Sequence, residues 1–327
     1  MNTFGKIFKI SVFGESHGEA VGVTLDGVKP GIRLNTADFE KDLKRRKAGV
    51  KGTTPRIEDD IPQIISGLFN GYTTGAPLTI LFKNLNKKSD EYNHLKNTPR
   101  PGHADFTATR KYLGFNDLRG GGHFSGRLTL ALVAAGVVAK KMIGNINIEA
   151  KLISVGGNVD IERTIEKIIK ENNSVGGLIE CNSTNIPIGI GEPFFNSVES
   201  VISHLAFSIP AIKGIEFGSG FAAASMKGSQ NNDLLVDSSG KTDSNNAGGV
   251  NGGITNGNNL VFRVAVKPTP SIGLEQLTTN MQTGKTESLK ISGRHDACIA
   301  LRVPVVIEAI TAIAFADLML CNAYINS

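Results

Sequence analysis

The chain has 327 residues, of which 40% are hydrophobic and 20% are charged, and this composition is typical of a soluble globular protein with a sizeable core. Its formal net charge is +5 and its isoelectric point is about 9.0, so anionic partners are favoured. No long Lys/Arg run occurs, and zinc-finger spacing and an RNP-type aromatic motif are missing, which argues against a nucleic-acid-binding protein and favours pockets for small anions.

The first predicted elements are two strands that flank a short polar loop. Residues 7–13 (I-F-K-I-S-V-F) and 20–25 have the composition of strands, and residues 14–18 between them read G-E-S-H-G. So short a connection excludes a helical crossover, which makes the strand pair antiparallel or bridged by the loop. The loop has two interpretations: a surface turn in which glycine adopts positive φ, or a site loop whose imidazole transfers protons.

A helix is predicted next, over residues 37–48. Thr36 is its expected N-cap, acidic residues occupy its first turn, basic residues occupy its last turn, and Gly49 ends it. Residues 76–82 form a predicted strand. The polar, Pro- and Asn-rich residues 83–107 are expected to form a long functional loop.

Helices and strands alternate irregularly along the rest of the chain. The further predicted helices are 127–143, 161–172, 197–207 and 304–323, and the further predicted strands are 146–155, 178–180, 186–190, 212–217 and 259–266. Residues 228–259 are expected to form an extended loop, and Glu308 and Asp317 are expected on the wetter side of the last helix. No change of composition marks a linker between domains, and no repeat of fixed length occurs. We therefore predict one mixed α/β domain over residues 1–327.

The sequence gives no sign of export or membrane insertion. The first ten residues lack the apolar core of a signal peptide, and the apolar residues 128–143 are too few to span a bilayer. The three cysteines are widely spaced and odd in number, so no disulfide framework is expected. We therefore expect a cytoplasmic protein without a membrane segment.

Four clusters combine glycine or proline bends with cations, and most of them contain a histidine. They are R-P-G-H-A-D (100–105), R-G-G-G-H-F-S-G-R (119–127), K-P-T-P-S (267–271) and G-R-H-D (293–296). Four of the 6 histidines lie in Gly-flanked loops, where imidazole suits proton transfer near neutral pH: His17, His103, His123 and His295. The glycines at 120–122 precede a predicted helix, so their N–H groups would favour an anion, although the Lys-Ser/Thr ending of a Walker loop is missing.

Two other kinds of site are disfavoured. Residues 218–223 (G-S-G-F-A-A) match a dinucleotide-binding pattern after a predicted strand, but turn residues follow where that motif requires a helix. Metal binding is disfavoured because the scattered histidines show neither H-x-H nor H-E-x-x-H spacing. His94 and His204 have no cationic, Gly-rich neighbourhood and are expected to be surface or core residues.

The four clusters, together with F-G-E-S-H-G (13–18) and N-A-G-G (246–249), occur in an order and spacing that resemble the chorismate synthase family, from the N-terminus to about residue 318. The resemblance implies a β-α-β sandwich that forms a homotetramer. It implies the conversion of 5-enolpyruvylshikimate 3-phosphate to chorismate, the last step of the shikimate pathway, by anti-1,4-elimination of phosphate and a proton. The family requires reduced FMN without net redox change. The sequence leaves open whether the enzyme reduces its own flavin with NADPH or depends on an external flavin reductase.

The resemblance also implies roles for individual residues. His17 would protonate the departing phosphate, His103 would donate to the reduced flavin and hold it anionic, and Asp296 would accept the proton of flavin N5. Ser16 and Ser125 would complete the hydrogen-bond network. The FMN-binding positions fall on His123, Phe124, Ser125, Pro210, Ala211, Gly252, Lys267, Pro268, Thr269, Pro270, Ser271 and Arg294. Because the substrate carries two carboxylates and a phosphate, the candidates that bind it are Arg45, Arg46, Arg100, Arg127 and Arg294.

The chain departs from the family pattern at several positions. A basic residue that is common near position 52 is replaced by Gly52, and other uncommon residues are Lys47, His123, Leu128 and Pro210. Two alternative functions stay open: a flavin- or nicotinamide-dependent oxidoreductase that consumes NADPH as product forms, and a nucleic-acid-binding protein with strongly salt-dependent affinity. Neither alternative accounts for His17, His103 and Asp296 all lying in the matched motifs.

Overall fold

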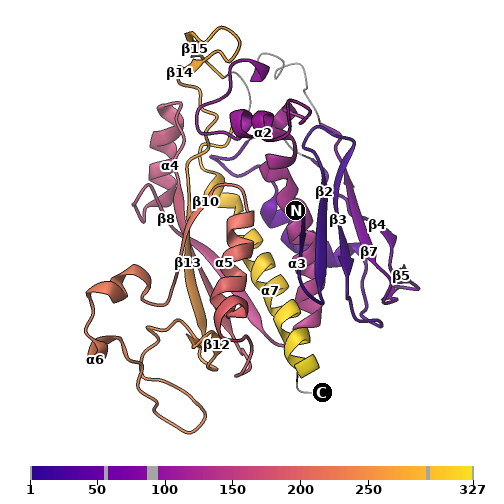
Figure 1. Cartoon of the computed structure of the whole chain (residues 1–327), viewed down its shortest axis with the longest axis vertical. Helices are drawn as coiled ribbons and strands as arrows, with labels where there is room; N and C mark the ends of the chain where they lie inside the picture. The colour runs from indigo at the N-terminus through magenta and orange to yellow at the C-terminus, as the bar shows by residue number, and fades with distance from the viewer. Residues whose placement is uncertain (1, 55–57, 87–94, 292–294, 326–327) are drawn as a thin grey trace.

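The computed structural model describes residues 2–54, 58–86, 95–291 and 295–325 of the chain. Arg294, which the resemblance assigns to both FMN and substrate, lies outside the described residues, as does His94. Within the described residues, two larger antiparallel sheets lie on either side of a group of helices, as Figure 1 shows. The mixed α/β sandwich expected from the sequence is confirmed.

The first sheet carries the predicted strand pair. Its strands, in spatial order, are β1 (Thr3–Phe4), β2 (Lys9–Gly14), β3 (Ala20–Asp26), β7 (Leu78–Lys83) and β4 (Gln63–Ser66). β2 and β3 are antiparallel, and Gly14 pairs with Val21, so the G-E-S-H-G segment is the tight connection at their end. Residues Leu78, Ile80 and Phe82 alternate along β7 and are fully buried, which turns one face of the sheet toward the core.

The second sheet closes the other side of the core. Its spatial order is β10 (Ile212–Phe217), β13 (Leu260–Val266), β9 (Gly177–Thr184) and β8 (Asn147–Val155). The strand predicted at residues 186–190 is wrong, because these residues form a turn. Pro187 has no N–H group for a ladder, and Gly189 has a φ of 93°, so the segment cannot continue the sheet.

Three helices fill the space between the two sheets: α3 (Thr129–Met142), α5 (Val198–Ser208) and α7 (Pro304–Ile325) (Figure 1). Residues 129–139 of α3 are buried without interruption, as expected for a core helix. Among the described residues, one helix is long and apolar enough to cross a membrane by length and composition, Pro304–Ala323, and 78% of its apolar window is buried inside the protein. α7 is therefore the central core helix.

The remaining elements lie around these layers. The helices are α1 (Glu40–Arg46), α2 (Asp105–Lys111), α4 (Ile161–Lys170) and α6 (Gly228–Asn231), and the short strands are β5 (Leu68–Phe69), β6 (Tyr72–Thr73), β11 (Val250–Asn251), β12 (Ile254–Thr255), β14 (Gln276–Thr279) and β15 (Thr286–Leu289). The predicted cap of the first helix is wrong: Asn35, not Thr36, accepts a hydrogen bond from the N–H of Ala37, at 2.9 Å. The dinucleotide-like residues 218–223 lead into a 3₁₀ turn, Gly220–Ser225, in place of an α-helix.

Glu308 and Asp317 do not lie on a wet face of α7, and this prediction is wrong. Both are nearly inaccessible, with relative exposures of 3% and 5%. Glu308 accepts two hydrogen bonds from Arg45, at 2.6 and 2.7 Å, and Asp317 accepts bonds from the backbone N–H groups of residues 6–8. Burial of a carboxylate is tolerated because these partners satisfy it, and both sets of partners are distant in sequence.

Helices α3 and α7 cross at Gly136, where there is no room for a side chain. A Cβ atom on Gly136 would lie 2.4 Å from Cβ of Ala309 and 2.5 Å from its Cα atom. We expect Gly136→Ala to lower the free energy of unfolding by about 1–3 kcal/mol, because the two helices must move apart. Denaturant unfolding measures this change.

Gly228→Ala is the matched control for this prediction. Gly228 lies in the short helix α6, and a Cβ atom there would meet nothing within 4 Å. We expect the control to be neutral or slightly stabilising. Equal stability of the two variants would show that the helix crossing is not tightly packed at this position.

Candidate active site

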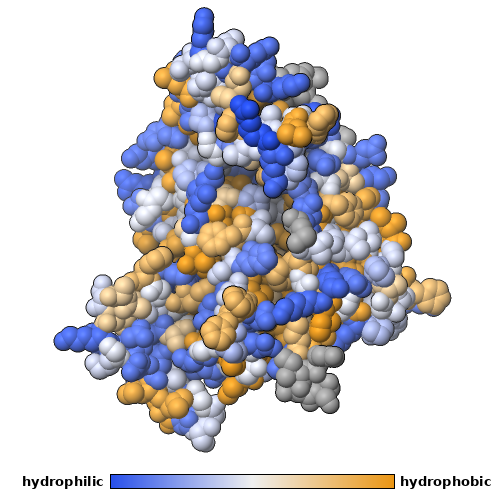
Figure 2. All heavy atoms as spheres, viewed as in Figure 1, coloured by the Kyte–Doolittle hydropathy of each residue, from blue (hydrophilic) through white to orange (hydrophobic). Residues whose placement is uncertain are grey.

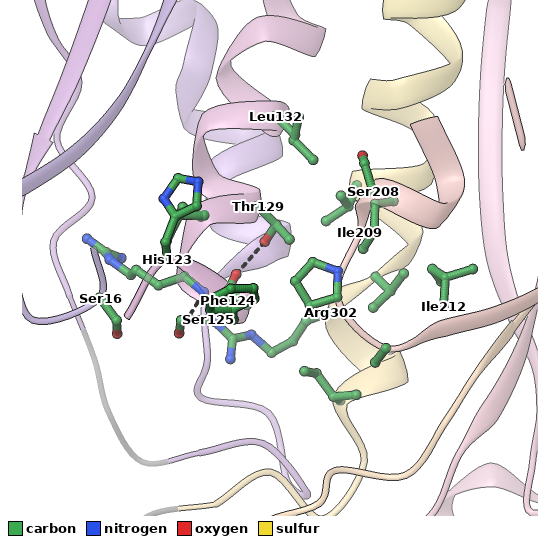
Figure 3. Close-up of a pocket in the computed structure, with 18 of the residues that line it drawn as sticks. Ser16, His123, Phe124, Ser125, Thr129, Leu132, Ser208, Ile209, Ile212 and Arg302 are labelled. Carbon is green, nitrogen blue, oxygen red and sulfur yellow. Dashed lines mark hydrogen bonds between the residues drawn. The ribbon is translucent and has the colours of Figure 1, made fainter. Parts of the chain in front are cut away.

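A cavity of about 820 Å³ opens between the first sheet, the three core helices and the loops that connect them. Figure 2 shows hydrophilic and hydrophobic residues meeting around a hollow near the middle of the same face that Figure 1 presents. Figure 3 shows Ser16, Ser125 and Arg302 on one side of the cavity and Leu132, Ile209 and Ile212 on another. The cavity therefore combines a polar end with an apolar wall.

The G-E-S-H-G segment is a site loop and not a surface turn. Ser16 and His17 are buried, with exposures of 1% and 5%. The backbone N–H of Ser16 donates to the carbonyl of Gly122 at 3.1 Å. A Cβ atom on Gly120 would lie 2.4 Å from Cδ2 of His17 and 2.9 Å from Oγ of Ser16, both closer than van der Waals contact. The loop and the Gly-rich segment therefore pack directly on each other, with Ser16 and Gly120 lining the cavity.

The three consecutive glycines have a conformation that other residues rarely adopt. Gly120, Gly121 and Gly122 have φ values of 60°, 83° and 53° within the 3₁₀ segment Arg119–Phe124. Because they carry no side chains, their backbone approaches two histidines closely. A Cβ on Gly120 would meet His17, and a Cβ on Gly121 would lie 3.4 Å from Cε1 and Nε2 of His103. Two histidines from distant motifs thus pack against one glycine turn.

His103 belongs to a hydrogen-bonded cluster with the buried ion pair of Arg100 and Asp105. The Asp105 carboxylate lies 2.6 Å from Nδ1 of His103 and accepts bonds from Nε and Nη2 of Arg100 at 2.7 and 2.8 Å. Burial opposes ionisation of Asp105, but the hydrogen bonds from Arg100 and His103 hold the pKa of its carboxyl well below the usual range. Asp105 therefore stays ionised, and it fixes the orientation of the imidazole beside the cavity.

A second buried cluster is built on Asp60, whose side chain is 1% exposed. Its carboxylate accepts a hydrogen bond from Nη2 of Arg46 at 2.9 Å and another from Nη1 of Arg127. Burial lowers the pKa of Arg46 to about 10, and repulsion from Arg302 adds to this effect. Among the described residues, Nε of Arg46 and Nη2 of Arg127 have no hydrogen-bond partner. In the described part of the chain, the cluster thus pairs two guanidinium groups with one carboxylate and keeps two N–H donors without an acceptor.

Asp296 lies at the polar end of the same cavity. Its Oδ1 atom accepts a bond from the N–H of Thr54 at 2.9 Å and lies 3.5 Å from Nη1 of Arg302. Arg302 in turn donates to the backbone carbonyl of Arg46 at 2.9 Å. Arg302 is a cationic lining residue that the sequence analysis did not name. Its position six residues after the G-R-H-D motif and just before the last helix is the signal that could have identified it.

Most of the predicted cofactor-binding residues meet at this cavity. Those that line it are His123, Phe124, Ser125, Pro210, Ala211, Lys267, Thr269, Pro270 and Ser271. His123 is fixed by Nδ1, which donates to the carbonyl of Gly14 at 2.8 Å. Pro268 and Gly252 do not line the cavity. Of the predicted substrate-binding residues described, Arg46, Arg100 and Arg127 line it and Arg45 does not, because Arg45 is paired with Glu308.

The arrangement suits chemistry on an anion that binds next to a flat apolar group. The arginines offer charge and donors for carboxylate or phosphate, while apolar side chains such as Leu132 and Ile209 cover the opposite wall. His103 lines the cavity, whereas His17 does not line it and packs against Gly120, which does. Among the described residues, no group of three or more His, Cys, Asp or Glu side chains could hold a metal ion.

Comparisons with known proteins give one consistent result. The sequence profile of the chorismate synthase family matches residues 8–320 of the chain. The chain is 62% identical over 327 residues to a chorismate synthase of Chitinophaga pinensis, covering 100% of this chain and 98% of that protein. It is 45% identical over 351 residues to a chorismate synthase of Dehalococcoides mccartyi, covering 98% and 96%. A crystal structure of chorismate synthase matches the fold with a TM-score of 0.75 and 26% identity, covering 98% of this chain and 93% of the other.

Proposed function

Because the chain belongs to the chorismate synthase family, we propose that it converts 5-enolpyruvylshikimate 3-phosphate to chorismate and inorganic phosphate. In this anti-1,4-elimination a C–O bond to phosphate and a ring C–H bond break, and the ring gains a second double bond. The observation that carries the proposal is the buried cluster of Arg46, Arg127 and Asp60 in a cavity that His103 also lines. The cluster provides binding for a trianionic substrate, and His17, packed against the lining residue Gly120, is the acid that we propose for the phosphate leaving group.

The arginine side chains bind and orient the substrate. Nη2 of Arg127 and Nε of Arg46 are buried donors without a protein acceptor among the described residues, so an oxyanion of the substrate would complete their hydrogen bonds. Arg302 adds a third cation at the same end of the cavity. Because these groups are fixed by Asp60 and by the backbone, they stabilise negative charge without reorganising.

His17 and Ser16 assist departure of the phosphate. The imidazole of His17 is held against Gly120, and the hydroxyl of Ser16 lines the cavity beside it. A proton given by His17 to a phosphate oxygen as the C–O bond breaks would neutralise the charge that develops there. His103, oriented by Asp105, and Asp296, held by Thr54 and Arg302, are the other groups that hold or move protons at the cavity.

The residues of the cavity fit reduced FMN. The apolar wall of Leu132, Ile209 and Ile212 matches a flat ring system, and the surplus arginine donors and Lys267 match anionic groups. We propose that the lining residues Phe124, Ser125, Pro210, Ala211, Lys267, Thr269, Pro270 and Ser271 hold it. When bound, reduced FMN supplies an electron-rich ring that facilitates loss of phosphate and proton without net redox change. The enzyme either reduces its own flavin with NADPH or receives reduced flavin from a separate reductase, and we expect a homotetramer.

An anaerobic assay tests the proposed function. Purified protein is mixed with photoreduced FMN and 5-enolpyruvylshikimate 3-phosphate, and chorismate absorbance and phosphate release are both followed. We expect equal amounts of chorismate and phosphate, with the flavin still reduced at the end. Absence of product in the presence of bound flavin would overturn the proposal and favour the oxidoreductase alternative.

A methyl group on Gly120 is expected to disturb the reaction. Its Cβ would lie 2.4 Å from Cδ2 of His17, so Gly120→Ala must displace the imidazole or the glycine turn. We expect kcat to fall at least about tenfold, because general acid catalysis is sensitive to small displacements. Gly114→Ala is the control: Gly114 also has positive φ, at 81°, but a Cβ there would meet nothing within 4 Å. Similar losses of kcat in both variants would exclude a specific effect on His17.

A further inference from the structure

Asn84 connects the two parts of the site that bind substrate and donate the proton. It follows β7 directly and is 4% exposed. Its Nδ2 group donates to the carbonyl of Glu15 and to the carbonyl of Gly18, both at 3.0 Å. Its Oδ1 atom accepts the Nε–H of Arg127 at 3.0 Å. One side chain therefore contacts the loop that carries Ser16 and His17 and also the guanidinium of Arg127.

The orientation of this amide is determined by its partners. Arg127 Nε can only donate, and the two carbonyl oxygens can only accept, so Oδ1 must face the arginine and Nδ2 must face the loop. The backbone N–H of Asn84 also donates to the carbonyl of Glu19 at 3.0 Å. The residue is thus fixed from both sides, and no other uncharged side chain of this size offers two donors and an acceptor in the same positions.

The two carbonyls that Asn84 binds lie on either side of Ser16 and His17. Glycines at both ends of this segment give the backbone freedom, so the loop needs an external restraint to hold the imidazole at one place. Because the same amide restrains Arg127, the position of the acid is tied to the position of a substrate-binding cation. Arg127 is itself held by Asp60 through Nη1, which joins the restraint to the buried arginine cluster.

We propose that Asn84 is a positioning residue, which sets the location of His17 relative to the anion held by Arg127. The proposal rests on the proposed function, because it assigns the acid role to His17 and the anion to Arg127. It predicts that loss of the Nδ2 donor lowers the rate of the chemical step. Substrate binding is preserved as long as an oxygen still accepts the Nε–H of Arg127.

Asn84→Asp separates the two sides of the amide. The variant keeps an oxygen for Nε of Arg127, but it places a second oxygen 3.0 Å from two carbonyl oxygens, which repels the loop. We expect kcat to fall about 10- to 100-fold, with KM for the substrate changed less than about threefold. Asn185→Asp is the matched control, since the Nδ2 group of Asn185 also donates to a backbone carbonyl, that of Asn145, and the residue does not line the cavity.

A double-mutant cycle distinguishes positioning from a general effect on the fold. If Asn84 acts through His17, Asn84→Asp should lower kcat in the wild-type background and have little further effect in His17→Ala. Equal losses in both backgrounds, or an unchanged kcat in Asn84→Asp, would overturn the proposal. If Asn84→Asp does not fold, Asn84→Ala replaces it, and the losses of kcat in the wild-type and His17→Ala backgrounds are again compared. If neither variant folds, Asn84 is a structural residue and the proposal is overturned. A wild-type protein that forms no chorismate would instead refute the proposed function.

Discussion

Replacement of His17 by alanine is expected to lower kcat by about 10²- to 10⁴-fold, which is the range that a positioned general acid contributes. The imidazole is 5% exposed and lies against Gly120 beside a cavity lined with arginines. Without it, the phosphate would leave as a more highly charged species, stabilised by the arginines alone. Anaerobic turnover with reduced FMN measures this loss, and titration of FMN shows whether the cavity still forms.

His204→Ala is the control for this experiment. His204 is an exposed histidine at the margin of the same cavity, where its ring packs edge-on against Phe4 at a centroid distance of 5.5 Å. Because His204 has no role in the proposed chemistry, we expect the kcat of His204→Ala to remain within a few-fold of the wild-type value. A His17→Ala enzyme that turned over as fast as the His204→Ala enzyme would remove His17 from the mechanism.

The second large effect concerns stability. Asp60→Ala is expected to lower the free energy of unfolding by about 3–5 kcal/mol, because it leaves the buried guanidinium groups of Arg46 and Arg127 without their shared carboxylate. Urea or thermal unfolding at neutral pH measures the change. Asp117→Ala is the control, since Asp117 pairs with Arg119 at the surface, where such a pair contributes at most about 1 kcal/mol.

The stability difference between wild type and Asp60→Ala should depend on pH in a defined direction. Burial favours the neutral acid, but the charges of Arg46 and Arg127 outweigh it and hold the pKa of Asp60 below its usual value. A carboxyl whose pKa is lower in the folded state stabilises the fold above the unfolded pKa, and this contribution is lost as pH falls through the folded pKa. The difference should therefore be constant near neutrality and narrow only in strong acid. A difference that narrowed already between about pH 8 and about pH 6 would contradict this assignment.

Much of the fold could be predicted from local sequence patterns. The composition of β2 and β3 predicts strands, the long apolar run of α3 predicts a buried helix, and the glycines that bound the G-E-S-H-G loop mark its short connection. The predictions failed where a residue's environment is set by distant parts of the chain. Glu308 and Asp317 are charged, and a charged residue on a helix is expected to face water. Inside the protein, however, their carboxylates accept hydrogen bonds from Arg45 and from the backbone N–H groups near the N-terminus.

The candidate site was predicted in its motifs but not in its supporting residues. The histidines and glycines of three distant motifs do meet, because His17 and His103 both pack against the turn at 120–122. Asp60, Asn84 and Arg302 carry no motif of their own, since their importance comes from a partner that only the fold brings near. The roles assigned to individual residues stay predictions until the variants are measured.

The bonds between Asp317 and the backbone of residues 6–8 have a consequence for synthesis of the protein. They join the segment between β1 and β2 to α7, which packs on β8 and β9 of the second sheet. During synthesis, the second sheet is therefore complete before the helix that covers its apolar face has been made. Until residues 304–325 follow, this face is exposed, and the nascent protein is prone to aggregation and dependent on chaperones.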